Sequence, residues 1–401
     1  MTSLIYCWFG FFKEFDAIYA WPHHSSTAIR FAPTIISPKS YSLFHYDIYD
    51  FVIEGDPMRS SQVGIFLSGR RDNWSWRSVD CHFILSSVIV TATMDNLTSE
   101  PAVACTIPTK ERVLLKKGAN FISVSFYIND TFLQSKAFTT TPTIAVPFYE
   151  RFYHNISVYT MVKNKRKELI EWIEYHLLIG IEHFYLYDNR GTEQLGLFLK
   201  RYLELGLVTI VYWPYTPPSG AHWNIIQSAS MNHALKNFGP FNKWLGYFDV
   251  DEYFQLNSTL IKSVISKSYT LADLFDYRFP EHDYPSGAQF VNCQISCFLS
   301  QNEIVASRYT LLFQKCNIVP IHNHCNTAAK MFIRPHNVPI MQNIHVLPIG
   351  MVFAQNVTLG QFGQFRHYHH GSVGSDLNIQ GVRDESMDEF ISLLFSRVIT
   401  Y

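Results

Sequence analysis

The chain has 401 residues, of which 47% are hydrophobic and 16% are charged. This length exceeds what one hydrophobic core usually organises, so we expect two domains. The 32 Lys and Arg residues nearly cancel the 33 Asp and Glu residues, which argues against nucleic acid as a partner and favours a compact polar substrate.

The first 12 residues are apolar, but Lys13, Glu14 and Asp16 end the run before it is long enough to span a bilayer. We interpret residues 1–40 as an N-terminal segment that includes the remnant of a signal anchor, so membrane association could follow from a short or missing anchor. A simple β-strand is the alternative.

Glycosylation sequons favour the lumen of the secretory pathway. They begin at Asn73, Asn96, Asn129, Asn155, Asn257 and Asn356. The 7 cysteines contain no CxxC pair, so they allow disulfides without indicating a zinc site.

Residues 41–148 predict a small antiparallel β domain, because short runs rich in Val, Ile, Phe and Thr alternate with turn residues. We expect a sandwich without a helix and without catalytic residues of its own.

From residue 149 to residue 372, strands and helices alternate. The predicted order is strand 156–164, helix 166–180, strand 183–188, helix 193–206, strand 207–213, helix 224–239 and a strand over "WLGYF" from 244. Strands connected in this way are usually parallel, and ligands bind beyond their carboxyl ends. The residues predicted to meet at that edge are Lys163, Asn164, Asp188, Asn189, Trp213 and 249–252. The remaining residues, 373–401, predict a C-terminal helical tail.

Asp249 and Asp251 follow the apolar strand and, in an extended chain, would point to one face. Two neighbouring carboxylates repel each other unless a cation compensates them, and a hard divalent ion such as Mn²⁺ or Mg²⁺ suits oxygen ligands. The alternative is a solvated turn in which Glu252 caps a helix.

The residues that surround this motif resemble glycosyltransferase family 92, which has the GT-A type of fold. The resemblance rests on "EWIEYH" (171–176), "GIEHFYLYDN" (180–189), Gln227, "DVDEYF" (249–254), "AAKMFIRPHN" (328–337) and "RHYHHG" (366–371), in that order along the chain. It implies a Rossmann-like α/β GT-A domain, preceded here by the β domain.

By this resemblance, the protein would be an inverting, metal-dependent transferase in the Golgi. It would move a sugar, most often galactose from UDP-galactose, onto a glycan acceptor. Asp249 and Asp251 would hold the metal and the diphosphate, and Asp188 and Asn189 would face the nucleoside. Asp188 also suits a plain turn.

Late histidines and cations complete the expected site. A C-terminal histidine often joins the metal in GT-A enzymes, and His345 is our first choice, with His367 second. Lys330, Arg334 and Arg366 are suited to diphosphate charge, with ordinary surface roles as the alternative. His176 lies on the apolar face of a helix and is expected to be a hydrogen-bonded core residue. The closely spaced "HNHC" (322–325) lacks a second pair of zinc ligands.

Inversion in a single displacement needs a base that takes the proton of the acceptor hydroxyl. Glu281, Asp283 and Glu303 are the candidates, and we favour Glu303. Two other functions remain open at this point: a non-catalytic protein that binds carbohydrate or nucleotide sugar on the same fold, and a metal-assisted hydrolase, for which more clustered Asp and His ligands would be needed.

Overall fold

The structure is a computed structural model. It describes residues 35–36, 41–43, 46–50, 62–67, 79–94, 102–116, 121–128, 131–139, 154–189, 194–213, 224–295, 318–320, 325, 328–338, 341, 343–346, 352–368, 381–383 and 388–399. Two compact units are distinguished, 1–32 and 33–401, and all described residues belong to the second. The apolar N-terminal run lies outside the described residues. Within these ranges no helix has the length and apolar character needed to cross a membrane.

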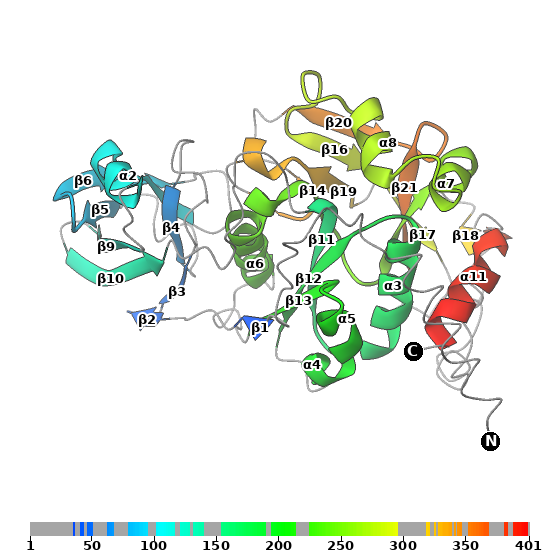
Figure 1. Cartoon of the computed structure of the whole chain (residues 1–401), viewed down its shortest axis with the longest axis horizontal. Coiled ribbons are helices and arrows are strands. Elements are labelled where there is room, and N and C mark those ends of the chain that lie inside the picture. Colours follow the sequence, from blue (N-terminus) through cyan, green and yellow to red (C-terminus); the bar gives the residue numbers. More distant parts are fainter. Residues whose placement is uncertain are drawn as a thin grey trace, which may run out of the picture. The chain divides into compact units, whose positions relative to one another are not determined.

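Apart from β1, the described strands before residue 140 form two antiparallel sheets (Figure 1). The first has the order β2-β3-β4-β8-β7, with β2 Tyr41–Leu43, β3 Tyr46–Asp50, β4 Gln62–Leu67, β7 Thr93–Met94 and β8 Ala102–Thr106. The second has the order β10-β9-β5-β6, with β5 Val79–Phe83, β6 Val88–Thr91, β9 Phe121–Ile128 and β10 Thr131–Thr139. A disulfide between the buried residues Cys81 and Cys105 links the two sheets.

The antiparallel pairing in this region agrees with the sequence prediction, but one helix was not expected. Helix α2 spans Thr109–Lys116. Its eight residues make about two turns, which is too short for a helical period to stand out from the surrounding strands.

The main sheet has eight strands in the order β1-β13-β12-β11-β14-β19-β16-β20. Their bounds are β1 Ile35–Ile36, β11 His154–Val162, β12 His183–Asp188, β13 Val208–Tyr212, β14 Asn242–Tyr247, β16 Gly287–Phe290, β19 Lys330–Ile333 and β20 Phe353–Val357. Strands β13, β12, β11 and β14 run parallel to one another, and β19 runs antiparallel to β14. The alternation predicted from the sequence is therefore confirmed.

The crossover helices lie where the sequence predicts them, with one difference. They are α3 Arg166–Leu178, α4 Leu195–Phe198, α5 Lys200–Glu204 and α6 Asn224–Asn237. A single helix was expected over 193–206, but it breaks at Leu199 into α4 and α5. Gly196 weakens the first of these turns.

Alternating side chains of the parallel strands pack on opposite layers, and Figure 1 shows α3 and α6 on opposite sides of these strands. Phe184 of β12 contacts Trp172 of α3. Tyr187, three residues later and on the opposite face, forms a hydrogen bond of 2.7 Å between its hydroxyl and His233 Nδ1 of α6. Side chains of a strand alternate between its two faces, so a buried parallel strand must be apolar on both. The hydrophobic run "HFYLY" meets this requirement.

A smaller sheet and several short elements follow the main strands. The three-stranded sheet has the order β15-β21-β17, with β15 Glu252–Leu256, β17 Asn292–Ile295 and β21 Gly363–Tyr368. The other elements are η2 Gly239–Phe241, α7 Ser258–Ile265, α8 Leu271–Arg278, β18 Ile318–Pro320, η3 Pro335–Asn337, β22 Gly381–Arg383 and α11 Asp388–Ile399.

A disulfide joins Cys293 of β17 to Cys325. Cys325 therefore has no thiolate to offer a metal, which removes it from the "HNHC" segment as a zinc ligand. His322 and His324 lie outside the described residues.

The C-terminal helix α11 is fastened to α3 by a buried ion pair. Arg397 Nε lies 2.9 Å from Glu174 Oε2, and Tyr202 donates its hydroxyl to Glu174 Oε1 at 2.6 Å. The tail predicted over 373–401 is therefore helical only in part: α11 packs on the first crossover helix, but residues 381–383 form strand β22.

Two stacked histidines lie at the opposite end of the sheet from the carboxyl ends of the parallel strands. The rings of His154 and His183 are 4.5 Å apart, and both side chains are buried. His183 Nδ1 is 2.8 Å from the Gly206 carbonyl oxygen, and Nε2 is 2.9 Å from Thr209 Oγ1. Burial lowers the pKa of His183 to about 4, and burial together with His183 lowers the pKa of His154 well below its ordinary value.

This histidine pair predicts a loss of stability in mild acid. Because the folded pKa of His183 lies below its unfolded value, the unfolded chain binds more protons, so stability falls as the pH drops from about 6.5 towards 4. In urea unfolding, we expect His183 by itself to lower the free energy of unfolding by about 2 kcal/mol between pH 7.5 and pH 5. His183→Gln should reduce that difference, and an equal difference in the variant would contradict the assignment.

Candidate functional site

The carboxyl ends of the parallel strands meet at one edge of the main sheet, as predicted. Val162, Asp188 and Tyr212 stand side by side in the strand register. Asn189 is fully buried. Its Nδ2 donates a hydrogen bond to the Trp213 carbonyl oxygen at 2.9 Å, which ties the end of β12 to the end of β13. Asp188 is half-buried at the same edge.

The motif that follows β14 forms a tight turn. The Glu252 amide donates to the Asp249 carbonyl at 3.0 Å, and the Glu252 carboxylate accepts from the Asp249 amide at 2.9 Å. The extended arrangement expected for the two aspartates is therefore wrong. The alternative of a helix cap is also wrong, because Glu252 is buried and begins strand β15.

The turn gives each aspartate its own set of partners. Asp249 Oδ1 accepts from Gln227 Nε2 at 3.2 Å, and Asp249 Oδ2 accepts from Lys330 Nζ at 2.7 Å. These partners come from α6 and β19. Two donors from different elements therefore orient a carboxylate that is still 35% exposed.

Asp251 is held more loosely. Its Oδ2 lies 3.5 Å from Lys165 Nζ, and its Oδ1 lies 3.7 Å from His367 Nε2. Lys165 follows Asn164, whose left-handed backbone (φ 54°) turns the chain from β11 into α3. The Tyr368 amide donates to the Asp251 carbonyl at 2.9 Å, which joins the turn to the end of β21.

Glu252 and Lys330 form the buried centre of the cluster. Both side chains are 1% exposed, and Lys330 Nζ lies 2.9 Å from Glu252 Oε2. Asn292 donates its Nδ2 to Glu252 Oε1 at 2.7 Å. A buried carboxylate next to a buried ammonium is stable only when such partners are present.

The pKa directions follow from this packing. Burial would raise the pKa of Asp249, but the Lys330 ammonium holds it below its ordinary value. Burial raises the pKa of Glu252. Burial would lower the pKa of Lys330, but Asp249 and Glu252 raise it, so Lys330 stays charged.

Both late histidines lie beside this cluster. His367 pairs with Glu252 across β21 and β15, so its ring faces the carboxylates. His345 is half-buried and places its Nδ1 3.1 Å from the Ala329 carbonyl oxygen. Burial and the nearby Lys330 ammonium lower the pKa of His345, while Asp249 opposes that shift.

Two of the expected cations lie elsewhere. Arg334 lies just past the end of β19 opposite to Lys330, where its guanidinium stacks 4.0 Å over Trp244 and donates to the Phe279 carbonyl. Arg366 precedes His367 on β21 and so faces the opposite side, where its Nε donates to Gln255 Oε1 at 2.8 Å. The structure does not bring either one to the carboxylates.

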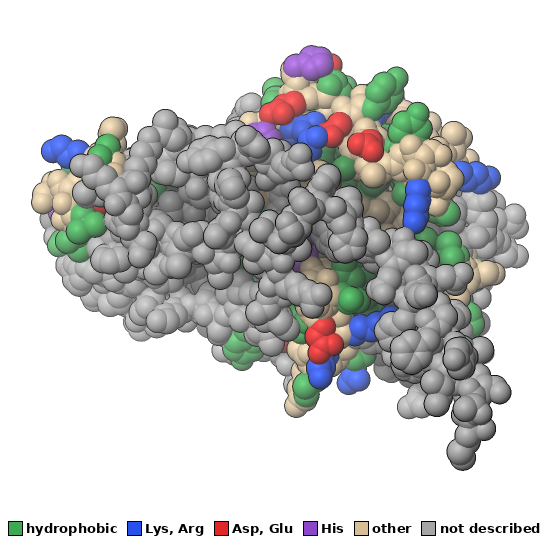
Figure 2. All heavy atoms as spheres, in the orientation of Figure 1, with side chains coloured by type: hydrophobic (Ala, Val, Ile, Leu, Met, Phe, Trp, Pro, Cys, Tyr) green, Lys and Arg blue, Asp and Glu red, His purple; other side chains and the backbone are tan. Residues whose placement is uncertain are grey.

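The candidate bases also fall outside the cluster. Glu281 is 54% exposed and pairs with His336 at 2.8 Å, next to Arg334. Asp283 is 59% exposed beside His282. Figure 2 shows acidic, basic and histidine side chains gathered on the surface near β16 and α8, the region of these pairs. Glu303 lies outside the described residues.

The acidic cluster supplies only some of the ligands that a metal ion needs. Among the described residues, no three His, Cys, Asp or Glu side chains converge as a complete metal site. Asp251 Oδ1 and His367 Nε2 are 3.7 Å apart, close to the ~3 Å that separates neighbouring ligands on a small octahedral ion. A carboxylate oxygen and an imidazole nitrogen at this separation could serve as two ligands of an ion such as Mn²⁺, with waters and phosphate oxygens as the others.

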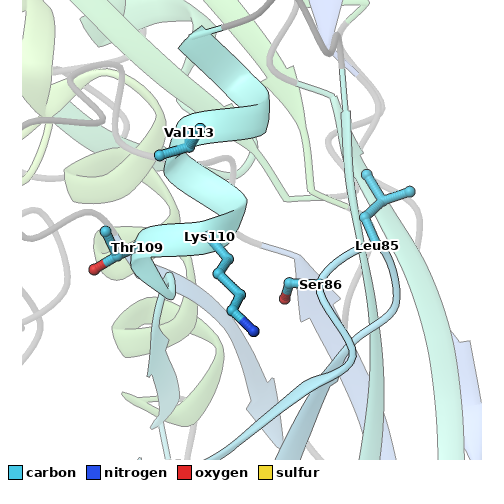
Figure 3. A pocket seen from close by; sticks show the side chains of 5 residues that line it. All are labelled: Leu85, Ser86, Thr109, Lys110 and Val113. Atoms are coloured by element: carbon cyan, nitrogen blue, oxygen red, sulfur yellow. The ribbon is translucent and has the colours of Figure 1, made fainter.

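A hollow lies in the N-terminal β region, far from the carboxylates in the sequence. It has a volume of about 410 Å³ and is lined by Leu85, Ser86, Thr109, Lys110 and Val113 (Figure 3). Figure 3 shows it between the turn that joins β5 to β6 and helix α2. It shares no residue with the acidic cluster.

Sequence reasoning did not assign three residues that contact the acidic cluster. Gln227 is part of the family resemblance only, and neither Lys165 nor Asn292 is given a role by the sequence. Gln227 and Lys165 lie near the ends of predicted strands and helices, so their positions could have placed them at the edge of the sheet beside the acids. Asn292 offered none, because only the pairing of β17 with β21 brings it close.

The fold and the site define an α/β protein with an acidic cluster at the carboxyl edge of a largely parallel sheet. The model of glycosyltransferase family 92 matches residues 154–399, which include the whole cluster and helix α11. The chain belongs to glycosyltransferase family 92.

Plant proteins are among its relatives. It is 27% identical over 145 residues to a glycosyltransferase family 92 protein of Ricinus communis, covering 35% of this chain and 25% of that protein. A family 92 protein of Arabidopsis thaliana is 30% identical over 156 residues, with 35% and 25% covered. A galactan beta-1,4-galactosyltransferase of Arabidopsis thaliana is 30% identical over 145 residues, with 35% and 26% covered. The matched stretches span about a quarter of these relatives.

Proposed function

We propose that this glycosyltransferase moves galactose from UDP-galactose to a hydroxyl of a glycan, with inversion and with a divalent ion, in the Golgi lumen. The supporting observation is the convergence of Asp251, Lys165 and His367, from three separate segments, beside Asp249 at the sheet edge. The relative named as a galactan beta-1,4-galactosyltransferase supports galactose as the sugar. The sequons support a lumenal location.

In this proposal, the cluster adopts the donor-binding role of a GT-A fold. Asp251 and His367 would hold Mn²⁺ or Mg²⁺, with Asp249 beside them and His345 as the further candidate. The ion, when bound, offsets the charge of the departing diphosphate. Asp188, half-buried at the end of β12, is suited to the nucleoside side of the donor, whereas the expected role of Asn189 there is not supported because its side chain is fully buried.

The proposed chemistry also needs a base for the acceptor hydroxyl. A β-linkage formed from an α-linked nucleotide sugar requires attack from the opposite face, with the hydroxyl proton taken as the bond forms. Glu303 remains our proposed base. The positions of Glu281 and Asp283 beside Arg334 and on the exposed surface make them weaker choices.

A transfer assay tests the function. We expect the purified protein with UDP-galactose and Mn²⁺ to extend β-1,4-galactan oligosaccharides or galactosylated and fucosylated N-glycans, and EDTA to stop the reaction. The products are measured by mass spectrometry, and UDP release is measured in parallel. Mn²⁺-dependent UDP binding without transfer or UDP release would instead support the non-catalytic alternative.

A further inference from the structure

Lys330 is the most completely buried cation of the acidic cluster. Its side chain is 1% exposed, and its Nζ lies 2.7 Å from Asp249 Oδ2 and 2.9 Å from Glu252 Oε2. One ammonium group therefore contacts two carboxylates that are only three residues apart. By contrast, the side chain of Lys165 is 32% exposed and lies 3.5 Å from Asp251.

The pairing of β19 with its two neighbouring strands fixes the position of the Lys330 ammonium. Tyr247 pairs with Met331 across β14 and β19, so Lys330 stands beside the chain as β14 ends and the turn begins. Phe290 pairs with Lys330 on the other side of β19. Lys330 is thus held by strands on both sides, and its ammonium reaches the turn regardless of any bound ligand.

The charges of the cluster explain why such a cation is needed. Asp249, Asp251 and Glu252 carry up to three negative charges within one turn, and Glu252 is almost wholly removed from water. Carboxylates this close repel each other, and a buried one is costly without a cation. Lys330 compensates Asp249 and Glu252, which it contacts directly, and leaves Asp251 beside His367.

We propose that Lys330 is a tethered counter-cation that holds Asp249 and Glu252 in position before a donor or a metal arrives, so that the exchangeable ion is left to Asp251 and His367. Lys330 is a positioning residue in this scheme. The inference rests on the proposed function only in taking Asp251 and His367 as the side of the cluster that binds the ion. It adds that Lys330, Asp249 and Glu252 assemble without a divalent ion.

A double-variant experiment tests this role. Lys330→Met leaves Glu252 without its buried cation, and we expect the melting temperature in EDTA to fall by about 10 °C. Adding Glu252→Gln should recover at least half of that loss, because the remaining carboxylate then has no buried neighbour of the same charge. Glu252→Gln in the wild-type background should give no comparable gain. Lys243→Met, which breaks the partly exposed pair with Asp276, is the matched control and should change the melting temperature little.

Binding of Mn²⁺ alone, measured by the electron paramagnetic resonance signal of the free ion, gives a second readout. Loss of a positive charge from the cluster should make Lys330→Met bind Mn²⁺ about tenfold more tightly than the wild type, whereas a mere loss of packing would leave the affinity equal or lower it. The proposal is overturned if Glu252→Gln fails to recover stability in Lys330→Met. Absence of Mn²⁺ binding by the wild type would count against the proposed metal site, and the melting experiment would then decide the role of Lys330 by itself.

Discussion

Replacing Asp251 by asparagine is expected to abolish sugar transfer and to weaken Mn²⁺-dependent UDP binding at least ~100-fold. The physical reason is the position of this carboxylate. It is 21% exposed, faces His367 Nε2 at 3.7 Å, and accepts only a distant contact from Lys165. Of the three acids in the turn it is the one whose oxygens are least engaged by protein donors, so it has most to offer a metal.

The same substitution should leave the fold intact. Removing one charge from three closely spaced carboxylates lessens their repulsion, so the melting temperature of Asp251→Asn should equal or exceed that of the wild type. Glu204→Gln, on the exposed surface of α5, is the control and should keep full transfer. Transfer by Asp251→Asn within threefold of the wild type would remove the acidic cluster from the proposed mechanism. The assay is initial-rate transfer with titrated Mn²⁺, with UDP binding measured by calorimetry.

Replacing Phe254 by alanine should cause the largest loss of stability. Phe254 is fully buried on β15, two residues from Glu252. Its ring contacts the rings of Phe275, Phe290, Phe332, Phe362 and Phe365. Truncating a buried phenylalanine in such a cluster costs about 4 kcal/mol, because the cavity is only partly filled by relaxation.

Urea unfolding followed by fluorescence or circular dichroism measures this effect. Phe254→Leu should lose less than about 1.5 kcal/mol, since most of the volume is kept. Tyr277→Ala removes a ring that is 88% exposed and should be nearly neutral. A loss below 1 kcal/mol in Phe254→Ala would show that the phenylalanine cluster does not support the turn that carries the acids.

The sequence was most informative where a local rule applies. Buried parallel strands must be apolar on both faces, and amphipathic crossover helices carry a 3.6-residue period, so β11, α3, β12, β13, α6 and β14 could be placed along the chain. His176 behaves as expected: its Nδ1 lies 2.7 Å from the Trp172 carbonyl, and its Nε2 accepts from the Phe254 amide at 3.3 Å. The break at Leu199 and helix α2 escaped this reasoning, because each involves only one or two turns.

Side chains that are distant in sequence could not be ranked in the same way. Lys330, Arg334 and Arg366 all belong to family-like basic segments, yet only Lys330 reaches the acids. Neighbouring residues of a strand point to opposite faces, and residues at its two ends lie many ångströms apart. A cation near the right segment can therefore still be on the wrong face or at the wrong end. The face and the end are set by strand pairing, and pairing between β19 and β14, or between β21 and β15, is a tertiary property.

By itself, the sequence determined the alternating strands and helices, the edge where polar residues gather, and the presence of two aspartates at the end of a buried strand. The tertiary structure alone decided that these aspartates lie in a turn rather than an extended strand, and that Asp249 is shared with a buried lysine while Asp251 faces His367. The physical reason is that local periodicity acts within a few residues along the chain. The partners of a buried charge are instead chosen by the packing of β14, β19 and β21, whose contacting residues lie about a hundred positions apart.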